Sequence, residues 1–216
     1  MPLSDNLDSI KKKIKAAAEK VNRDYKEIRL IAVTKNISLE TIKGAVNLRV
    51  NDIGENKIQE AIKKNIASLN VKKHFIGHLQ TNKIKKAVEI FDVIHSVDSL
   101  KLLKKIDKEL IKINKKMDVF VEMNVSGEKS KYGILPYELK KFIKEKLKNA
   151  KIIGLMAMVP LTEPEKTRTY FRKLKELAEK YSLKELSMGT TNDFEVAVQE
   201  GATMIRVGRG IFGERK

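Results

Sequence analysis

The segment RLIAVTK, residues 29–35, shows the unit from which most of the chain is built. It is short, apolar and rich in β-branched residues, so it predicts a buried strand. Ser38 follows closely and can cap a helix that carries Ile42 and Val46 on one face. A strand followed at once by a helix is the repeating unit of a parallel sheet covered by helices.

The same alternation continues along the chain. The further segments expected as strands are 50–54, 74–77, 91–95, 118–124, 151–156, 185–188 and 203–207. Eight such units predict closure into a barrel rather than an open sheet. A doubly wound open sheet usually has fewer strands and a glycine-rich turn after the first. Here Thr34, Lys35 and Asn36 stand in that place.

A helix is also expected before the first strand. Residues 4–22 place five apolar residues on one helical stripe: Leu7, Ile10, Ile14, Ala17 and Val21. Since the chain stops soon after residue 207, we expect a short or missing last outer helix and a barrel wall covered by the N-terminal helix. The expected fold is therefore α/β, a single (β/α)8 TIM-type barrel with an extra N-terminal helix, formed as one domain by residues 1–216.

Composition limits the functions open to this chain. It has no cysteine, which excludes disulfides and thiolate chemistry, and no long apolar run, so a cytoplasmic protein without a membrane span is expected. The formal net charge is +17. Lysines recur in nearly every helical segment without aromatic neighbours, so we interpret this charge as solvated helix faces. A nucleic-acid binder, whose affinity would fall steeply with salt, is the alternative.

The carboxyl ends of barrel strands carry the active site in this architecture. Lys35 directly follows the apolar run 30–33 and would reach the barrel mouth with its amine desolvated. Such an amine favours its neutral form, which can form a Schiff base. The alternative is a lysine that only extends into solvent at the rim.

Two further segments suggest a phosphate site. Residues 187–192 (SMGTTN) offer hydroxyls, a glycine and a helix start after the seventh strand, and residues 206–210 (RVGRG) follow the eighth. Barrels often bind phosphate between these two loops, although small polar residues are also ordinary in turns. A lysine Schiff base beside a phosphate site predicts pyridoxal 5′-phosphate. A phosphosugar aldolase also fits, but it would need more carboxylates at the rim than Glu55.

Longer motifs accompany these features. They are IAVTK (31–35), DIGENKIQE (52–60), HFIGHLQTNK (74–83), IHSVDS (94–99), VEMNVSGEKSKYG (121–133), GLMAMVP (154–160), LSMGTTNDFEVAVQEGATMIRVG (186–208) and IFG (211–213). Through them the chain resembles the pyridoxal phosphate homeostasis protein family, which is related to the N-terminal barrel of alanine racemases. The resemblance runs from about residue 5 to residue 213.

The resemblance implies a set of cofactor-binding residues: Lys35, Asn56, His78, Met156, Ser187, Gly189, Thr191, Arg206, Gly208 and Arg209. Lys35 would carry the Schiff base, and Arg206 would approach the pyridine nitrogen and leave it unprotonated. Ser187, Gly189 and Thr191 would bind the phosphate, helped by Gly208 and Arg209. Asn56 would lie beside the ring, with His78 and Met156 at the same mouth. Thr190 and Arg209 depart from the family's usual residues, which leaves the phosphate ligands open.

The function implied is buffering or delivery of the cofactor, without catalytic turnover and without a metal. Implied partners are the cofactor and apo enzymes that need it, with the protein itself a monomer. The alternative is an amino-acid racemase. Alanine racemases use a second domain and a tyrosine from a partner subunit. This sequence offers no obvious second acid/base opposite Lys35, although Tyr132 in the loop after the fifth strand could approach it.

Overall fold

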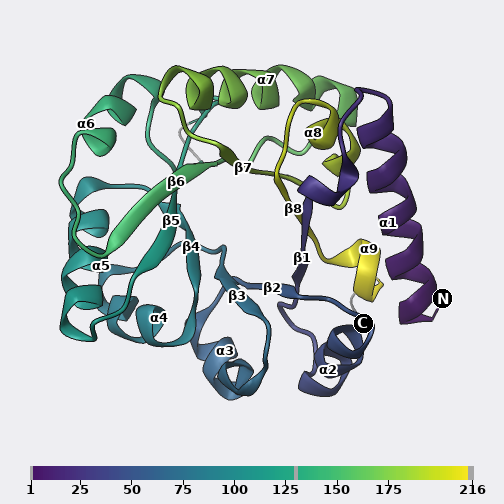
Figure 1. Cartoon of the computed structure of the whole chain (residues 1–216), viewed down its shortest axis with the longest axis horizontal. Helices are drawn as coiled ribbons and strands as arrows, with labels where there is room; N and C mark the ends of the chain where they lie inside the picture. Colours follow the sequence, from purple (N-terminus) through teal and green to yellow (C-terminus); the bar gives the residue numbers. More distant parts are fainter. Residues whose placement is uncertain (1, 129–130, 214–216) are drawn as a thin grey trace.

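The computed structural model describes residues 2–128 and 131–213; Lys129 and Ser130 of the 121–133 motif lie outside them. In the described residues, eight parallel strands form a closed barrel in chain order (Figure 1). They are β1 Arg29–Val33, β2 Asp52–Glu55, β3 Lys72–Phe75, β4 Val93–Val97, β5 Met117–Glu122, β6 Ala150–Met156, β7 Glu185–Thr190 and β8 Met204–Val207. β1 pairs with β8 and thereby closes the barrel. The expected (β/α)8 architecture is confirmed.

Helices surround the barrel (Figure 1). They are α1 Leu3–Glu19, α2 Leu39–Asn47, α3 Ile58–Lys63, α4 Ile84–Ile90, α5 Leu100–Lys112, α6 Leu139–Ile143, α7 Pro164–Lys180, α8 Phe194–Gln199 and α9 Arg209–Phe212. Short 3₁₀ turns supplement them at Tyr25–Glu27, Ile66–Ser68, Thr81–Lys83 and Pro136–Glu138. None of the helices in the described part of the chain has the length and apolar character that crossing a membrane requires.

Apolar side chains pack on both sides of the strands. The larger cluster lies between the barrel and its helices, as the amphipathic pattern of the helices requires. A smaller cluster fills the barrel interior with Ile31, Val93, Phe120, Met156 and Met204. Because the interior is packed with side chains, a ligand can enter the barrel only at its ends.

The N-terminal helix takes the expected place. α1 packs against α8 and against α9, the short last helix (Figure 1). Asn6 Nδ2 donates a 3.0 Å hydrogen bond to the carbonyl of Ile211. Val21 falls beyond the end of α1 and is 38% exposed, so the buried stripe ends at Ala17 and Ala18.

Two helix ends are set by single residues. The helical segment that follows β2 is interrupted at Asn65, whose φ of 52° is left-handed and ends the helical path. Ser99 caps α5 by accepting a 3.3 Å hydrogen bond from the amide of Leu102. The preceding residue, Asp98, places its Oδ2 3.2 Å from His78 Nδ1, near the barrel mouth.

Candidate functional site

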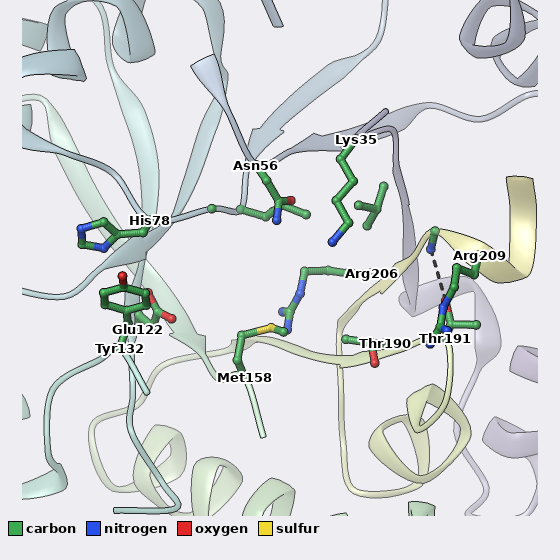
Figure 2. Close-up of a pocket in the computed structure, with 14 residues that line it drawn as sticks. Lys35, Asn56, His78, Glu122, Tyr132, Met158, Thr190, Thr191, Arg206 and Arg209 are labelled. Carbon is green, nitrogen blue, oxygen red and sulfur yellow. Dashed lines mark hydrogen bonds between the residues drawn. The ribbon is translucent and has the colours of Figure 1, made fainter. Parts of the chain in front are cut away.

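A cavity of about 610 Å³ opens at the carboxyl ends of the strands (Figure 2). Seven of the ten expected cofactor-binding residues line it: Lys35, Asn56, His78, Thr191, Arg206, Gly208 and Arg209. These seven come from segments that follow β1, β2, β3, β7 and β8, or from β8 itself, so the closed barrel is what brings them together.

Lys35 lies two residues beyond the end of β1 and is half-buried. Figure 2 shows its side chain extending into the cavity, with Asn56 on one side and Arg206 opposite its amine. The backbone is fixed on both sides of this lysine. The amide of Thr34 donates to the Gly54 carbonyl at 2.9 Å, and the next residue, Asn36, takes a left-handed φ of 61°.

Glu55 is not the carboxylate of this cavity. Its side chain is fully buried against Lys64, whose Nζ lies 2.7 Å from Oε1, and it also accepts a 2.7 Å hydrogen bond from Thr34 Oγ1. Burial raises the pKa of Glu55, and the contacts with Lys64 and Thr34 oppose that shift. The Glu55–Lys64 pair therefore supports the backbone that precedes Lys35.

Arg206 is buried on β8, at 4% exposure, and its guanidinium is held by three contacts. Nη1 donates to Ser187 Oγ at 2.6 Å, while Nη2 contacts the Ala157 carbonyl at 2.9 Å and Met158 Sδ at 3.1 Å. Burial lowers the pKa of Arg206 to about 10, against the opposing effect of Asp193 and Glu122, so the group stays charged at neutral pH.

Three expected residues do not line the cavity. Met156 lies fully buried in the interior cluster, and Met158, two residues further, supplies the thioether of the cavity wall. Ser187 is fully buried below the cavity, where Arg206 and His95 occupy its hydroxyl. Gly189 has a φ of 89°, and a Cβ there would lie 2.6 Å from that of Ala197, so its role is to permit the tight turn onto α8.

The loops after β7 and β8 do meet, as expected. Thr191 Oγ1 accepts a 3.4 Å hydrogen bond from the amide of Gly208. Arg209 Nη2 lies 3.4 Å from Asn192 Oδ1, so this arginine extends along the rim between the two loops. Thr190 completes the same side of the cavity. Together these residues offer hydroxyl and cationic donors to one anion.

Glu122 is a cavity residue that the sequence analysis missed. It is 5% exposed at the end of β5 and lines the cavity on the side of His78 (Figure 2). Burial, with a further contribution from Asp98, raises its pKa to about 7, and Arg206 opposes the shift. Strand alternation could have found it, because Phe120 and Glu122 share the inward face. Asn124, expected at the strand end, instead accepts from the Gly127 amide at 2.9 Å within its own loop.

Asn56 presents an unsatisfied acceptor. Its side-chain Oδ1 is buried and has no hydrogen-bond partner among the described residues. A buried carbonyl without a donor costs about 1–3 kcal/mol, which a bound molecule with an N–H or O–H group would recover. Within the same residues, no group of three or more histidine, cysteine, aspartate or glutamate side chains could hold a metal ion.

Comparison with known proteins adds a family to this geometry. Residues 6–216 match the family model described as alanine racemase, N-terminal domain. The pyridoxal phosphate homeostasis protein of Aquifex aeolicus (strain VF5) is 40% identical over 100% of both chains. The protein of the same name from Escherichia coli (strain K12) is 32% identical over 99% of this chain and 97% of its own.

Solved structures resemble the whole chain as well. PipY of Synechococcus elongatus PCC7942, solved with PLP bound, is 32% identical, with a TM-score of 0.83 over 98% of this chain and 100% of that one. Alanine racemase of Clostridium difficile 630 is 16% identical, with a TM-score of 0.73 over 99% of this chain and 56% of that one. At that identity the likeness shows a shared barrel fold.

Proposed function

Because this chain belongs to the alanine racemase N-terminal domain family, and within it to the pyridoxal phosphate homeostasis proteins, we propose that it binds pyridoxal 5′-phosphate in the cavity at the barrel mouth, held on Lys35. The observation that carries the proposal is the placement of the Lys35 side chain inside the cavity, opposite Arg206 (Figure 2). When bound, the cofactor would supply an aldehyde carbon, and Lys35 would supply the amine that holds it.

The residues present fit this cofactor. Lys35, Arg206 and Arg209 bring three cationic side chains to a cavity with one carboxylate, Glu122, and that balance suits a phosphate. Thr191, Gly208 and Arg209 are the proposed phosphate ligands. The unsatisfied carbonyl of Asn56 can accept from a polar group on the ring. Ser187 and Gly189 are not proposed as ligands, because they lie behind this wall.

Arg206 would determine how the ring is held. A guanidinium has five N–H groups and no acceptor, and both Nη2 contacts and one Nη1 contact are already made with protein atoms. Arg206 therefore offers the cavity only hydrogen-bond donors. Such a donor would pair with a pyridine nitrogen that carries no proton. An unprotonated ring withdraws electrons weakly, so this arrangement suits plain binding of the cofactor or racemisation better than transamination.

The proposed role is accordingly that of a carrier which buffers the cofactor or passes it to apo enzymes, working as a monomer in the cytoplasm. The homeostasis names of the relatives at 32–40% identity support this role over racemase activity. The solved alanine racemase structures of Clostridium difficile 630 are 16% identical, and this chain covers only 56–59% of their length. The racemase alternative is therefore not favoured.

Titration of the protein with pyridoxal 5′-phosphate tests the binding part of the proposal. We expect a new absorbance band for the lysine-bound cofactor, which Lys35→Ala removes. Lys101→Ala, on the exposed side of α5, is the matched lysine control and should keep the band. An unchanged band in Lys35→Ala would overturn the assignment.

Delivery needs a separate experiment. The holo protein is incubated with an apo enzyme that depends on pyridoxal 5′-phosphate, and the recovery of activity is compared with that given by the same concentration of free cofactor. Faster recovery with the holo protein supports delivery. Equal or slower recovery leaves buffering as the role.

A further inference from the structure

A row of buried polar residues crosses the barrel interior below the cavity. From Arg206 Nη1 the contacts run to Ser187 Oγ at 2.6 Å and from there to His95 Nδ1 at 2.8 Å. His95 Nε2 lies 2.8 Å from His74 Nδ1, and His74 Nε2 lies 2.8 Å from Asp52 Oδ1. Ser187, His95 and His74 are fully buried. The row therefore joins a cation at the cavity to a carboxylate at the start of β2.

The chemistry of the end groups fixes the direction of every hydrogen bond in this row. The guanidinium can only donate, so Ser187 accepts from it and its own hydrogen is left to donate to His95 Nδ1. A neutral His95 then carries its proton on Nε2 and donates to His74 Nδ1. A neutral His74 likewise carries its proton on Nε2 and donates to the ionised Asp52.

The surroundings keep both imidazoles neutral. Burial lowers the pKa of His74 and lowers that of His95 far below its ordinary range. The charged groups that face them are Arg206, Lys72 and Arg29, which disfavour a further positive charge, and Asp52, which favours one on His74. The ring of Phe120 stacks on His95 at 4.4 Å between centroids, which leaves no room for water on that face.

We propose that Ser187, His95, His74 and Asp52 are positioning residues for Arg206, joined in one directed relay of hydrogen bonds that runs from the cavity to the amino-terminal end of the barrel. Asp52 also lines a separate cavity of about 350 Å³ at that end, so the far end of the relay lies at a solvent-accessible opening. The relay itself is a property of the protein without ligand. Its effect on the cofactor rests on the proposed function.

The relay has a defined response to acid. A proton added at His74 makes both of its nitrogens donors, so His95 must accept at Nε2 and carry its own proton on Nδ1. Ser187 would then accept from both Arg206 and His95, and its hydroxyl hydrogen would lose its acceptor. Protonation near Asp52 would thus reverse two bonds of the relay and leave the hydroxyl hydrogen of Ser187, the residue that holds Arg206, without an acceptor.

Nitrogen NMR of the ligand-free protein, labelled with ¹⁵N-histidine, tests the relay directly. The chain has three histidines, so the signals of His74 and His95 can be assigned with one variant each. We expect both to be neutral with the proton on Nε2, and to resist protonation at a pH where a free histidine peptide, with a pKa of about 6.5, is half protonated. A proton on Nδ1 of either ring, or a charged His74 at neutral pH, would overturn the proposal.

A pair of serine variants tests the link to the cavity. Ser187→Ala removes the bridge between Arg206 and His95. We therefore expect the proton of His95 to distribute over both ring nitrogens and the variant to bind pyridoxal 5′-phosphate about tenfold more weakly than the wild type. Ser96→Ala is the matched control, because Ser96 is an equally buried serine whose hydroxyl has no partner among the described residues.

The variants also separate the possible failures. Asp52→Ala removes the acceptor for His74 and should change the proton positions on the two histidines. Asp52→Asn keeps an acceptor oxygen and should leave them as in the wild type. If Ser187→Ala leaves both histidine spectrum and cofactor affinity as in Ser96→Ala, the relay does not exist. If the wild-type histidines behave as expected but Lys35 captures no cofactor, the proposed function fails and the relay stands.

Discussion

The ring of Tyr132 stacks on the ring of His78, with centroids 4.2 Å apart and planes 17° apart. Both line the cavity on the side away from Lys35 (Figure 2). His78 is also held at 3.2 Å by Asp98, while Tyr132 comes from the loop after β5 and is 59% exposed. The cavity wall on the side away from Lys35 is therefore formed by the exposed ring of Tyr132, stacked on His78, which Asp98 holds in place.

Removing this stack should open the cavity. Tyr132→Ala is expected to speed cofactor release several-fold, because a stacked aromatic pair contributes about 0.5–1.5 kcal/mol beyond its buried area. Tyr132→Phe keeps the ring and should release the cofactor at the wild-type rate, as measured by trapping with an apo enzyme. A loss of retention in Tyr132→Phe would mean that the hydroxyl, rather than the stack, holds the cofactor.

Tyr132→Phe also tests racemisation. Exchange of the Cα hydrogen of an added amino acid in D₂O should be absent in both wild type and variant. Rapid exchange that depends on Lys35 and on the Tyr132 hydroxyl would contradict the carrier role.

Glu122 should make the ligand-free protein less stable at alkaline pH. Its folded pKa of about 7 lies above the ordinary value of 4.5, so ionisation disfavours the folded state and the loss develops as pH rises from 4.5 to 7. Glu122→Gln should therefore raise the free energy of unfolding by about 3 kcal/mol at pH 8.5 and change it little at pH 4. Urea titrations at the two pH values measure this, and an equal effect at both would show that the charge is not the cause.

Gly154 should tolerate no side chain. A Cβ at this position would lie 1.9 Å from the carbonyl oxygen of Glu185, where β6 and β7 pair. Gly154→Ala is expected to lose about 3 kcal/mol or more of stability, because the backbone pairing must separate. In Gly44→Ala on α2, the new Cβ would lie at an ordinary contact distance of 3.6 Å from Leu3 Cδ2. This variant should therefore gain about 0.5–1 kcal/mol of stability. Thermal melts of the two variants should therefore shift in opposite directions.

Local sequence signals were sufficient to predict the barrel. Apolar β-branched runs mark most strands to within a few residues, since both faces of a barrel strand are largely buried. Buried polar residues such as His74, His95 and Ser187 nevertheless stand inside several strands. Lys35 could be assigned to the cavity because it directly follows such an apolar run, and Arg206 because it lies at the end of one. The break at Asn65 could not be predicted, because one left-handed residue decides it.

The depth of a side chain in the barrel was harder to predict. Ser187 and Met156 both face inward, but strand register determines whether an inward residue meets the cavity or the layer below. The register between β7 and β8 shifts between Ser187 and Thr190, which a sequence read strand by strand does not show. Ser187 consequently supports Arg206 from below, and the relay through His95 and His74 was not foreseen at all.

Reductive trapping tests the central claim most directly. The protein is mixed with one equivalent of pyridoxal 5′-phosphate, reduced with borohydride so that any lysine adduct becomes permanent, and digested for mass spectrometry. We predict one dominant phosphopyridoxyl adduct, on the peptide that contains Lys35, and its loss in Lys35→Ala. Labelling spread over the many helix lysines, or unchanged labelling in that variant, would contradict a cofactor site built on Lys35.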